Sequence, residues 1–176
     1  MAIRPILHYP DKRLRTPGEP VEEFGAELQQ LVEDMAETMY AAPGVGLAAP
    51  QIGVAQRVFI IDVATDDDEP SDLMVFVNPE ILEKQGECLF DEGCLSFPGA
   101  REEIERAEWV KVRAQDQFGE TFELEADGLL AIAVQQQVGE RVSFFTEGQA
   151  AQAGPLLAIP AQLEDDEARS YGKLWE

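Results

Sequence analysis

The chain has 176 residues, of which 45% are hydrophobic, and its formal net charge at pH 7 is −22. This length and this hydrophobic fraction predict one folded domain with a core of its own, and they exclude a disordered chain. The negative charge excludes a protein whose main task is to hold nucleic acid, because phosphate binding needs clustered Lys and Arg.

Two further features bear on the compartment. No apolar run approaches the roughly 20 residues that a membrane helix needs, and the first 15 residues show no secretion signal. The two cysteines, Cys88 and Cys94, are too few for a disulfide framework, which favours a reducing compartment. We therefore expect a cytoplasmic protein with no membrane contact.

The first predicted elements are a helix and two strands. Residues 20–44 are the clearest helix, because apolar side chains recur there at helical spacing before Pro43 and Gly44 end it. Residues 57–63 (RVFIIDV) and 73–82 (LMVFVNPEIL) are short and rich in β-branched and aromatic residues. They predict two strands, separated by an acidic loop.

A hairpin and a second helix follow. Residues 109–126 alternate apolar and polar side chains on both sides of a turn at 116–119 (DQFG), which predicts a β-hairpin. Residues 128–141 (GLLAIAVQQQVGER) carry Leu130, Val134 and Val138 every four residues, which predicts an amphipathic helix with Asp127 as its N-cap.

This order of elements predicts an α+β domain in which a mainly antiparallel sheet packs against helices. From Gln136 onward the texture changes, because the chain becomes rich in Gln, Ala and Gly and its periodicity weakens. We therefore divide the sequence into a domain over residues 1–135 and a divergent C-terminal segment over residues 136–176.

Two short segments could carry chemistry. GVGLAAPQ (44–51) is typical of a turn followed by a core segment, and its glycines also permit a close approach by a ligand. DEGCLSFPG (91–99) places Cys94 at an expected strand end, where it is either a small buried residue, a nucleophile or a metal ligand. A cysteine nucleophile needs a histidine base, and His8, the single histidine, lies in an expected surface segment.

Four segments together resemble one family. ILHYPDKRLRTPGEPVEEF, GVGLAAPQIGV, EGCLSFPG and GLLAIAVQ occur in the order and spacing of the peptide deformylases, so the chain resembles that family over about residues 3 to 135. The resemblance implies an α+β fold, peptide deformylase-like, in which the sheet packs around a buried C-terminal helix. It also implies hydrolysis of the N-formyl group from the initiator methionine of new polypeptides.

The resemblance further implies a divalent metal, commonly iron(II), which zinc or nickel can replace. In the family a cysteine and the two histidines of an H-E-x-x-H helix hold this metal, whose bound water attacks the formyl carbon, and the glutamate carries the proton. Cys94 matches the cysteine ligand. The side chain of Gln51 and the backbone N–H of Leu95 match the donors that meet the charge on the formyl oxygen.

Other positions match the family's contacts with its substrate, the N-formyl-methionyl peptide. The matched positions are Gly46 and Gly93 for backbone pairing, Arg101 for a basic residue near the entrance, and Val45, Leu129, Ile132 and Ala133 for the wall of the methionine pocket. Many bacterial relatives use a basic final helix to approach the ribosome, whereas this chain has the acidic run QLEDDEAR (162–169). This charge argues against ribosome binding.

The third family motif is different in this chain. Gln136, Gln137 and Glu140 stand where the family has the first histidine, the glutamate and the second histidine. A side-chain amide is a poor metal ligand and no base, so we expect hydrolysis to be impaired. Three accounts stay open: a non-catalytic N-formyl-methionyl peptide-binding module, a slow hydrolase with a metal site rebuilt from Cys94, Glu140 and a third residue, and an altered 3′ end of the coding sequence.

Overall fold

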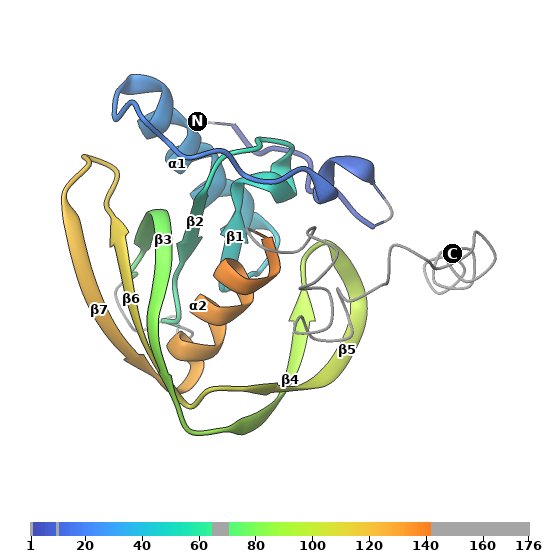
Figure 1. Ribbon diagram of the computed structural model, residues 1–176. Coiled ribbons are helices and arrows are strands. Elements are labelled where there is room, and N and C mark those ends of the chain that lie inside the picture. Colours follow the sequence, from blue (N-terminus) through green and yellow to red (C-terminus); the bar gives the residue numbers. More distant parts are fainter. Residues whose placement is uncertain (1, 10, 65–70, 142–176) are drawn as a thin grey trace.

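The computed structural model describes residues 2–9, 11–64 and 71–141 (Figure 1). The expected acidic loop and the C-terminal segment after residue 141 lie outside the described residues. In chain order the elements are η1 (Lys12–Arg15), α1 (Ala26–Ala41), β1 (Gly46–Ala48), η2 (Ala49–Ile52), β2 (Val58–Ile61), β3 (Met74–Gln85), β4 (Cys88–Cys94), β5 (Phe97–Arg106), β6 (Trp109–Gln115), β7 (Thr121–Asp127) and α2 (Gly128–Arg141).

The first predicted helix is confirmed as α1, although it is shorter than the segment that predicted it. It begins after Gly25 and ends at Ala41, where the N–H groups of Ala42 and Gly44 bond to the carbonyl oxygen of Met39. Its apolar side chains at helical spacing are buried: Leu28, Leu31, Val32, Met35 and Met39. These side chains form one core cluster with residues of β1, η2, β2 and β3.

The N-terminal segment is bonded to this helix through one buried carboxylate. Asp34 accepts hydrogen bonds from the N–H of Ala2 at 2.9 Å and from Nε of Arg4 at 2.8 Å. The bond from the Arg4 guanidinium, with a further bond from Gln30, holds the pKa of Asp34 below its ordinary value of 3.8. The carboxylate therefore links the start of the chain to α1.

The main sheet has five strands in the order β1-β2-β3-β6-β7, and all its strand pairs are antiparallel. The two predicted strands are confirmed as β2 and β3. The predicted hairpin is confirmed as β6 and β7, with Trp109 opposite Asp127 and Gln115 opposite Thr121. Its turn closes where Gly119, at a φ of 87°, donates to the carbonyl oxygen of Asp116.

A second pair of strands, β4 and β5, forms a two-stranded antiparallel ribbon, of which the sequence predicted only a strand end at Cys94. Figure 1 shows the ribbon opposite the five-stranded sheet, with α2 between them. Strand β4 ends at Cys94, which confirms the predicted strand end. This end of β4 lies close to α2, because Gly93 accepts a hydrogen bond from Gln136.

The second predicted helix is confirmed as α2, and it forms part of the core. Ala131, Ile132, Ala133 and Val134 are buried, and most of them join a second apolar cluster with side chains of the sheet. The rings of Phe59 and Phe76 stack in this cluster with centroids 4.6 Å apart. The fold is therefore α+β, with an antiparallel sheet packed around a buried helix, as the sequence predicts.

Two expectations remain at this level. Helix α2 continues from Gly128 to Arg141, across the expected boundary after residue 135, and the division of the chain into two parts stays a prediction. Within the described ranges, none of the helices is both long enough and apolar enough to span a bilayer.

Candidate functional site

A cavity of about 460 Å³ lies where β1, η2, the end of β4 and α2 meet. Nine of the ten candidate residues line it: Val45, Gly46, Gln51, Gly93, Cys94, Leu95, Leu129, Ile132 and Ala133. The tenth, Arg101, lies in β5 opposite Gly93 in the strand register, and its side chain is outside the described part. The fold thus brings together three segments that lie more than 30 residues apart in the sequence.

Gln51 is fixed in the wall of this cavity. It lies in η2 and is 1% exposed, and its Oε1 accepts a hydrogen bond from the N–H of Ala48 at 2.8 Å. Its Nε2 therefore points the other way, 3.1 Å from Oγ of Ser96 and 3.7 Å from Sγ of Cys94. Because the backbone holds the oxygen, the amide presents its N–H groups beside the cysteine sulfur.

Cys94 and Leu95 occupy the tip between β4 and β5. Neither Cys94 nor Cys88 takes part in a disulfide bond. The side chain of Leu95 packs against the first core cluster and lies close to Gly44, where an added Cβ would be 2.6 Å from Leu95 Cδ1. A side chain at position 44 would therefore displace the end of the Leu95 side chain, so GVGLAAPQ and EGCLS pack closely against each other.

Helix α2 contributes two glutamine side chains to the cavity. Gln136 donates a hydrogen bond from Nε2 to the carbonyl oxygen of Gly93 at 2.9 Å. Gln137 is 3% exposed, and a Cβ added to Gly46 would lie 3.0 Å from its Nε2. The α2 side of the site is therefore lined by amides that face β4 and β1.

Comparison with known proteins identifies the family of this chain. A family model described as polypeptide deformylase matches residues 3–140. A peptide deformylase from Chromobacterium violaceum is 54% identical over 138 residues, which cover 78% of this chain and 81% of that protein. The chain belongs to the peptide deformylase family.

Solved structures of the family have the same fold. A peptide deformylase from Legionella pneumophila superposes with a TM-score of 0.79 at 44% identity, covering 98% of this chain and 97% of that chain. A Met-Ala-Ser-bound deformylase from Acinetobacter baumannii gives a TM-score of 0.75 at 36% identity, covering 80% of this chain and 93% of that one. The deformylase-like fold expected from the four motifs is thereby confirmed.

The donors of this family member do not fit the metal that the family implies. Among the described residues, no three His, Cys, Asp or Glu side chains come together in a way that could hold an ion. His8 is exposed in the N-terminal segment, and it does not line the cavity. One thiolate beside two amides lacks the imidazole ligands on which iron(II), zinc and nickel sites depend.

Two side chains that position the site, Ser96 and Gln135, were not predicted from the sequence. Ser96, 1% exposed, bonds to Gln51, and Gln135 bonds through both ends of its amide to the backbone of Ala107. These contacts hold the tip of the β4–β5 ribbon and α2 in place. Only the position of Gln135 on the buried side of an apolar helix hinted at such a role.

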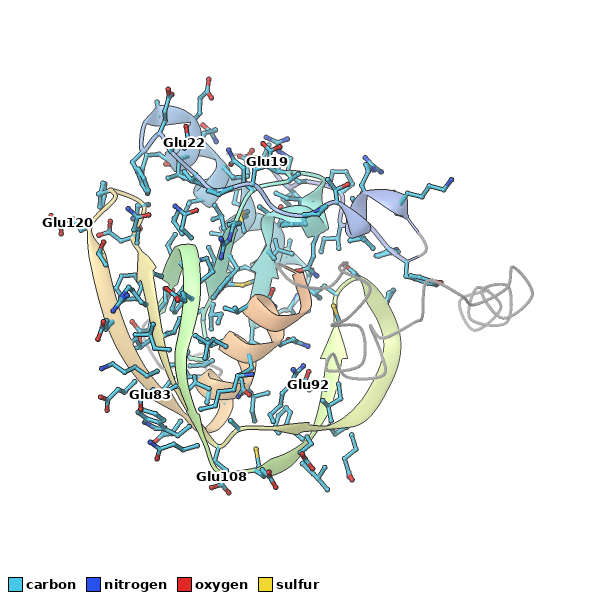
Figure 2. All side chains as sticks on the ribbon, viewed as in Figure 1. Glu19, Glu22, Glu83, Glu92, Glu108 and Glu120 are labelled. Carbon is cyan, nitrogen blue, oxygen red and sulfur yellow. The ribbon has the colours of Figure 1, made fainter. Side chains whose placement is uncertain are left out.

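A buried ion pair supports the ribbon. Arg106 of β5 donates to both carboxylate oxygens of Glu92 in β4, at 2.7 and 2.9 Å, and both side chains are buried. Figure 2 shows Glu92 between the ribbon and α2, whereas Glu22, Glu83, Glu108 and Glu120 lie at the periphery of the molecule. This bidentate pair fixes the strand that leads directly into Gly93 and Cys94.

Proposed function

We propose that this chain binds the N-formylmethionyl end of peptides in the cavity between η2, β4 and α2, and that it hydrolyses the formyl group far more slowly than a metal-loaded deformylase. The observation that carries the proposal is the fixed amide of Gln51, whose oxygen is held by Ala48 and whose nitrogen lies beside Cys94. This fixed donor supports the proposal that the site recognises a formyl oxygen.

The formyl oxygen would accept a hydrogen bond from Nε2 of Gln51, with the backbone N–H of Leu95 as the second donor. A hydrogen-bond donor held by its other end costs little entropy when the ligand arrives. The backbones of Gly46 and Gly93 would pair with the peptide, because both lie at strand positions in the cavity wall.

The methionine side chain would lie against the apolar part of the wall. Val45, Leu129, Ile132 and Ala133 line the same cavity, and the last three come from the first two turns of α2. An unbranched thioether fits such a surface without needing a polar partner. Arg101 is proposed, from the family motif alone, as a basic residue near the entrance.

Weak hydrolysis follows from the side chains of α2. A metal-dependent deformylase needs an activated water and a base, and Gln136 and Gln137 supply neither an imidazole ligand nor a carboxylate. Gln136 is also engaged with Gly93. The described residues therefore support peptide binding but supply no base for activating a water molecule.

A second candidate is a peptide-binding module with no catalysis at all. It is favoured by the lack of any group of three metal-ligating side chains within the described ranges. A metal site rebuilt around Cys94 and Glu140 would instead favour slow turnover. The two candidates share the ligand and differ in metal content and in turnover.

The test measures binding, turnover and metal on the purified full chain. Calorimetry with formyl-Met-Ala-Ser and with Met-Ala-Ser is expected to show preference for the formylated peptide, with formate release several orders of magnitude below that of the Chromobacterium relative. Equal affinity for the two peptides would contradict the proposed recognition. A stoichiometric metal together with rapid formate release would contradict the proposed impairment.

Gly46→Phe and Phe118→Ser form the variant pair for this test. A phenylalanine at position 46 fills the cavity wall next to Gln137 and is expected to abolish peptide binding. Phe118 is 69% exposed at the hairpin turn between β6 and β7, so its replacement is expected to leave binding unchanged.

A further inference from the structure

Two buried side-chain atoms in the described part of the chain have no hydrogen-bond partner there: Nε of Arg57 and Oε1 of Gln137. One is a donor and the other is an acceptor. Leaving such an atom buried and unpaired destabilises the folded state, because the atom loses its bonds to water and gains none in return. Two unpaired atoms of opposite kind therefore indicate a missing partner that can serve both.

The two residues line the same small cavity, whose volume is about 10 Å³. That is about the least space in which one water molecule fits. A water molecule accepts a hydrogen bond from Nε of Arg57 and donates one to Oε1 of Gln137, so it satisfies both atoms at once. We propose that one buried water bridges Arg57 and Gln137, and that this bridge directs the Gln137 amide nitrogen into the ligand cavity.

The chemistry of the two atoms selects water over an ion. A cation would face the Arg57 guanidinium, and an anion would face the carbonyl-type oxygen of Gln137. An apolar group would leave both polar atoms unpaired. Arg57 is itself held in position, because its Nη2 donates to the carbonyl oxygen of Pro79 at 3.0 Å.

Gln137 stands in the wall between the small cavity and the ligand cavity, since it lines both of them. Its oxygen is the buried, unpaired end of the amide. Its nitrogen lies on the side of Gly46, which lines the ligand cavity. With the oxygen bonded to the water, the N–H groups are available to a carbonyl oxygen of the ligand, in addition to those of Gln51.

This consequence for the ligand rests on the proposed function, whereas the water itself does not. It makes Gln137 a second amide donor for the formyl oxygen, and it makes Arg57 a positioning residue that acts through the water. The family's glutamate would present an acceptor at this position. A donor at position 137 therefore departs from the family motif.

A high-resolution crystal structure of the wild-type chain tests the bridge without any variant. The expected result is one ordered water within about 3.2 Å of both Arg57 Nε and Gln137 Oε1. Direct contact of the two side chains, another bound group or the lack of an ordered water between them would each overturn the proposal.

A double-mutant cycle tests the consequence for ligand binding. The affinity ratio between formyl-Met-Ala-Ser and Met-Ala-Ser is measured for wild type, Arg57→Met, Gln137→Leu and the double variant. Each single change is expected to lower the ratio about fivefold to tenfold, the worth of one hydrogen bond. The double variant is expected to match Gln137→Leu, because Arg57 acts only through Gln137.

One control variant and two further outcomes separate the possible failures. Arg113→Met removes an exposed arginine that lines neither cavity and is expected to leave the ratio unchanged. An unaltered ratio in Arg57→Met, or an equal loss in the Gln137→Leu background, would overturn the positioning role. A wild-type ratio of one would refute the proposed function, and the crystallographic water would still decide the bridge.

Discussion

Nε2 of Gln136 lies 2.9 Å from the carbonyl oxygen of Gly93, so a direct hydrogen bond joins α2 to β4 at the cavity. In the family a metal joins the same helix to the cysteine at the end of this strand. In this chain a hydrogen bond of modest strength, donated by the Gln136 side-chain amide, therefore joins the two elements that metal coordination joins in the family. Because α2 already lies beside the end of β4, restoring the H-E-x-x-H residues on α2 should bring them close to Cys94.

The combined change Gln136→His, Gln137→Glu and Glu140→His is expected to create a tight metal site with Cys94. Histidines four residues apart lie on one face of a helix, and a thiolate completes the ligand set. Metal per chain is measured by elemental analysis, together with formate release from formyl-Met-Ala-Ser. The same triple change with Cys94→Ser is the control, and it is expected to bind metal far more weakly. A metal-free triple variant would contradict the inferred geometry of α2.

The Gln51 amide can be tested by exchanging only its donor end. Gln51→Glu keeps an oxygen for the Ala48 N–H, which lies 2.8 Å from Oε1, but it replaces the N–H groups beside Cys94 with a second oxygen. Preference for the formylated peptide is expected to fall at least tenfold in calorimetry, because the donor is lost and a charge is added. Gln51→Leu is expected to lower stability as well, since it leaves the buried N–H of Ala48 unpaired. Unchanged preference in both variants would remove Gln51 from the recognition site.

The Glu92–Arg106 pair is expected to stabilise the ribbon. Arg106→Met leaves a buried carboxylate without its partner and should lower the free energy of unfolding by about 3 to 5 kcal/mol in urea denaturation. Arg113→Met, which breaks an exposed pair with Glu123, should leave the free energy of unfolding almost unchanged, because water screens the two charges. A cost for Arg106→Met as small as for Arg113→Met would show that the buried pair does not support β4.

Asp34 is expected to make the stability of the folded chain depend on pH under acidic conditions. Because the folded-state pKa of Asp34 lies below 3.8, its contribution is present above the unfolded pKa and is lost as the pH falls through the folded pKa. Asp34→Asn is expected to melt at a lower temperature than wild type at pH 7. The difference should close as the pH falls below about 4. A constant difference from pH 7 to pH 2 would rule out this carboxylate as its source.

The sequence predicted those elements whose side chains repeat with one clear period. Met35 and Met39 mark the buried face of α1, and Val110 and Val112 alternate with less buried neighbours in β6. The β4–β5 ribbon could not be predicted from such a period, because few of its described side chains are buried. Two of the buried ones are the charged partners Glu92 and Arg106. An ion pair inside a ribbon removes the apolar alternation on which strand prediction depends.

The residues that line the cavity were predicted from the resemblance to the deformylase family and not from any periodic pattern in the sequence. Gly46 and Cys94 lie 48 positions apart, and no local pattern indicates that both line one cavity. The bonds that orient the site were not predictable in this way. The contact of Gln135 with Ala107 depends on where α2 crosses the chain between β5 and β6, which is a property of the whole fold.

Metal stoichiometry after anaerobic loading of the full wild-type chain with iron(II), nickel or zinc tests the central claim most directly. Loosely bound metal is removed by gel filtration, and the sulfur ligand is followed by X-ray absorption on the retained metal. The account predicts far less than one metal per chain, since Gln136 and Gln137 replace a ligand and the base. One metal per chain, bonded to the sulfur of Cys94 and to at least two further protein donors, would contradict it.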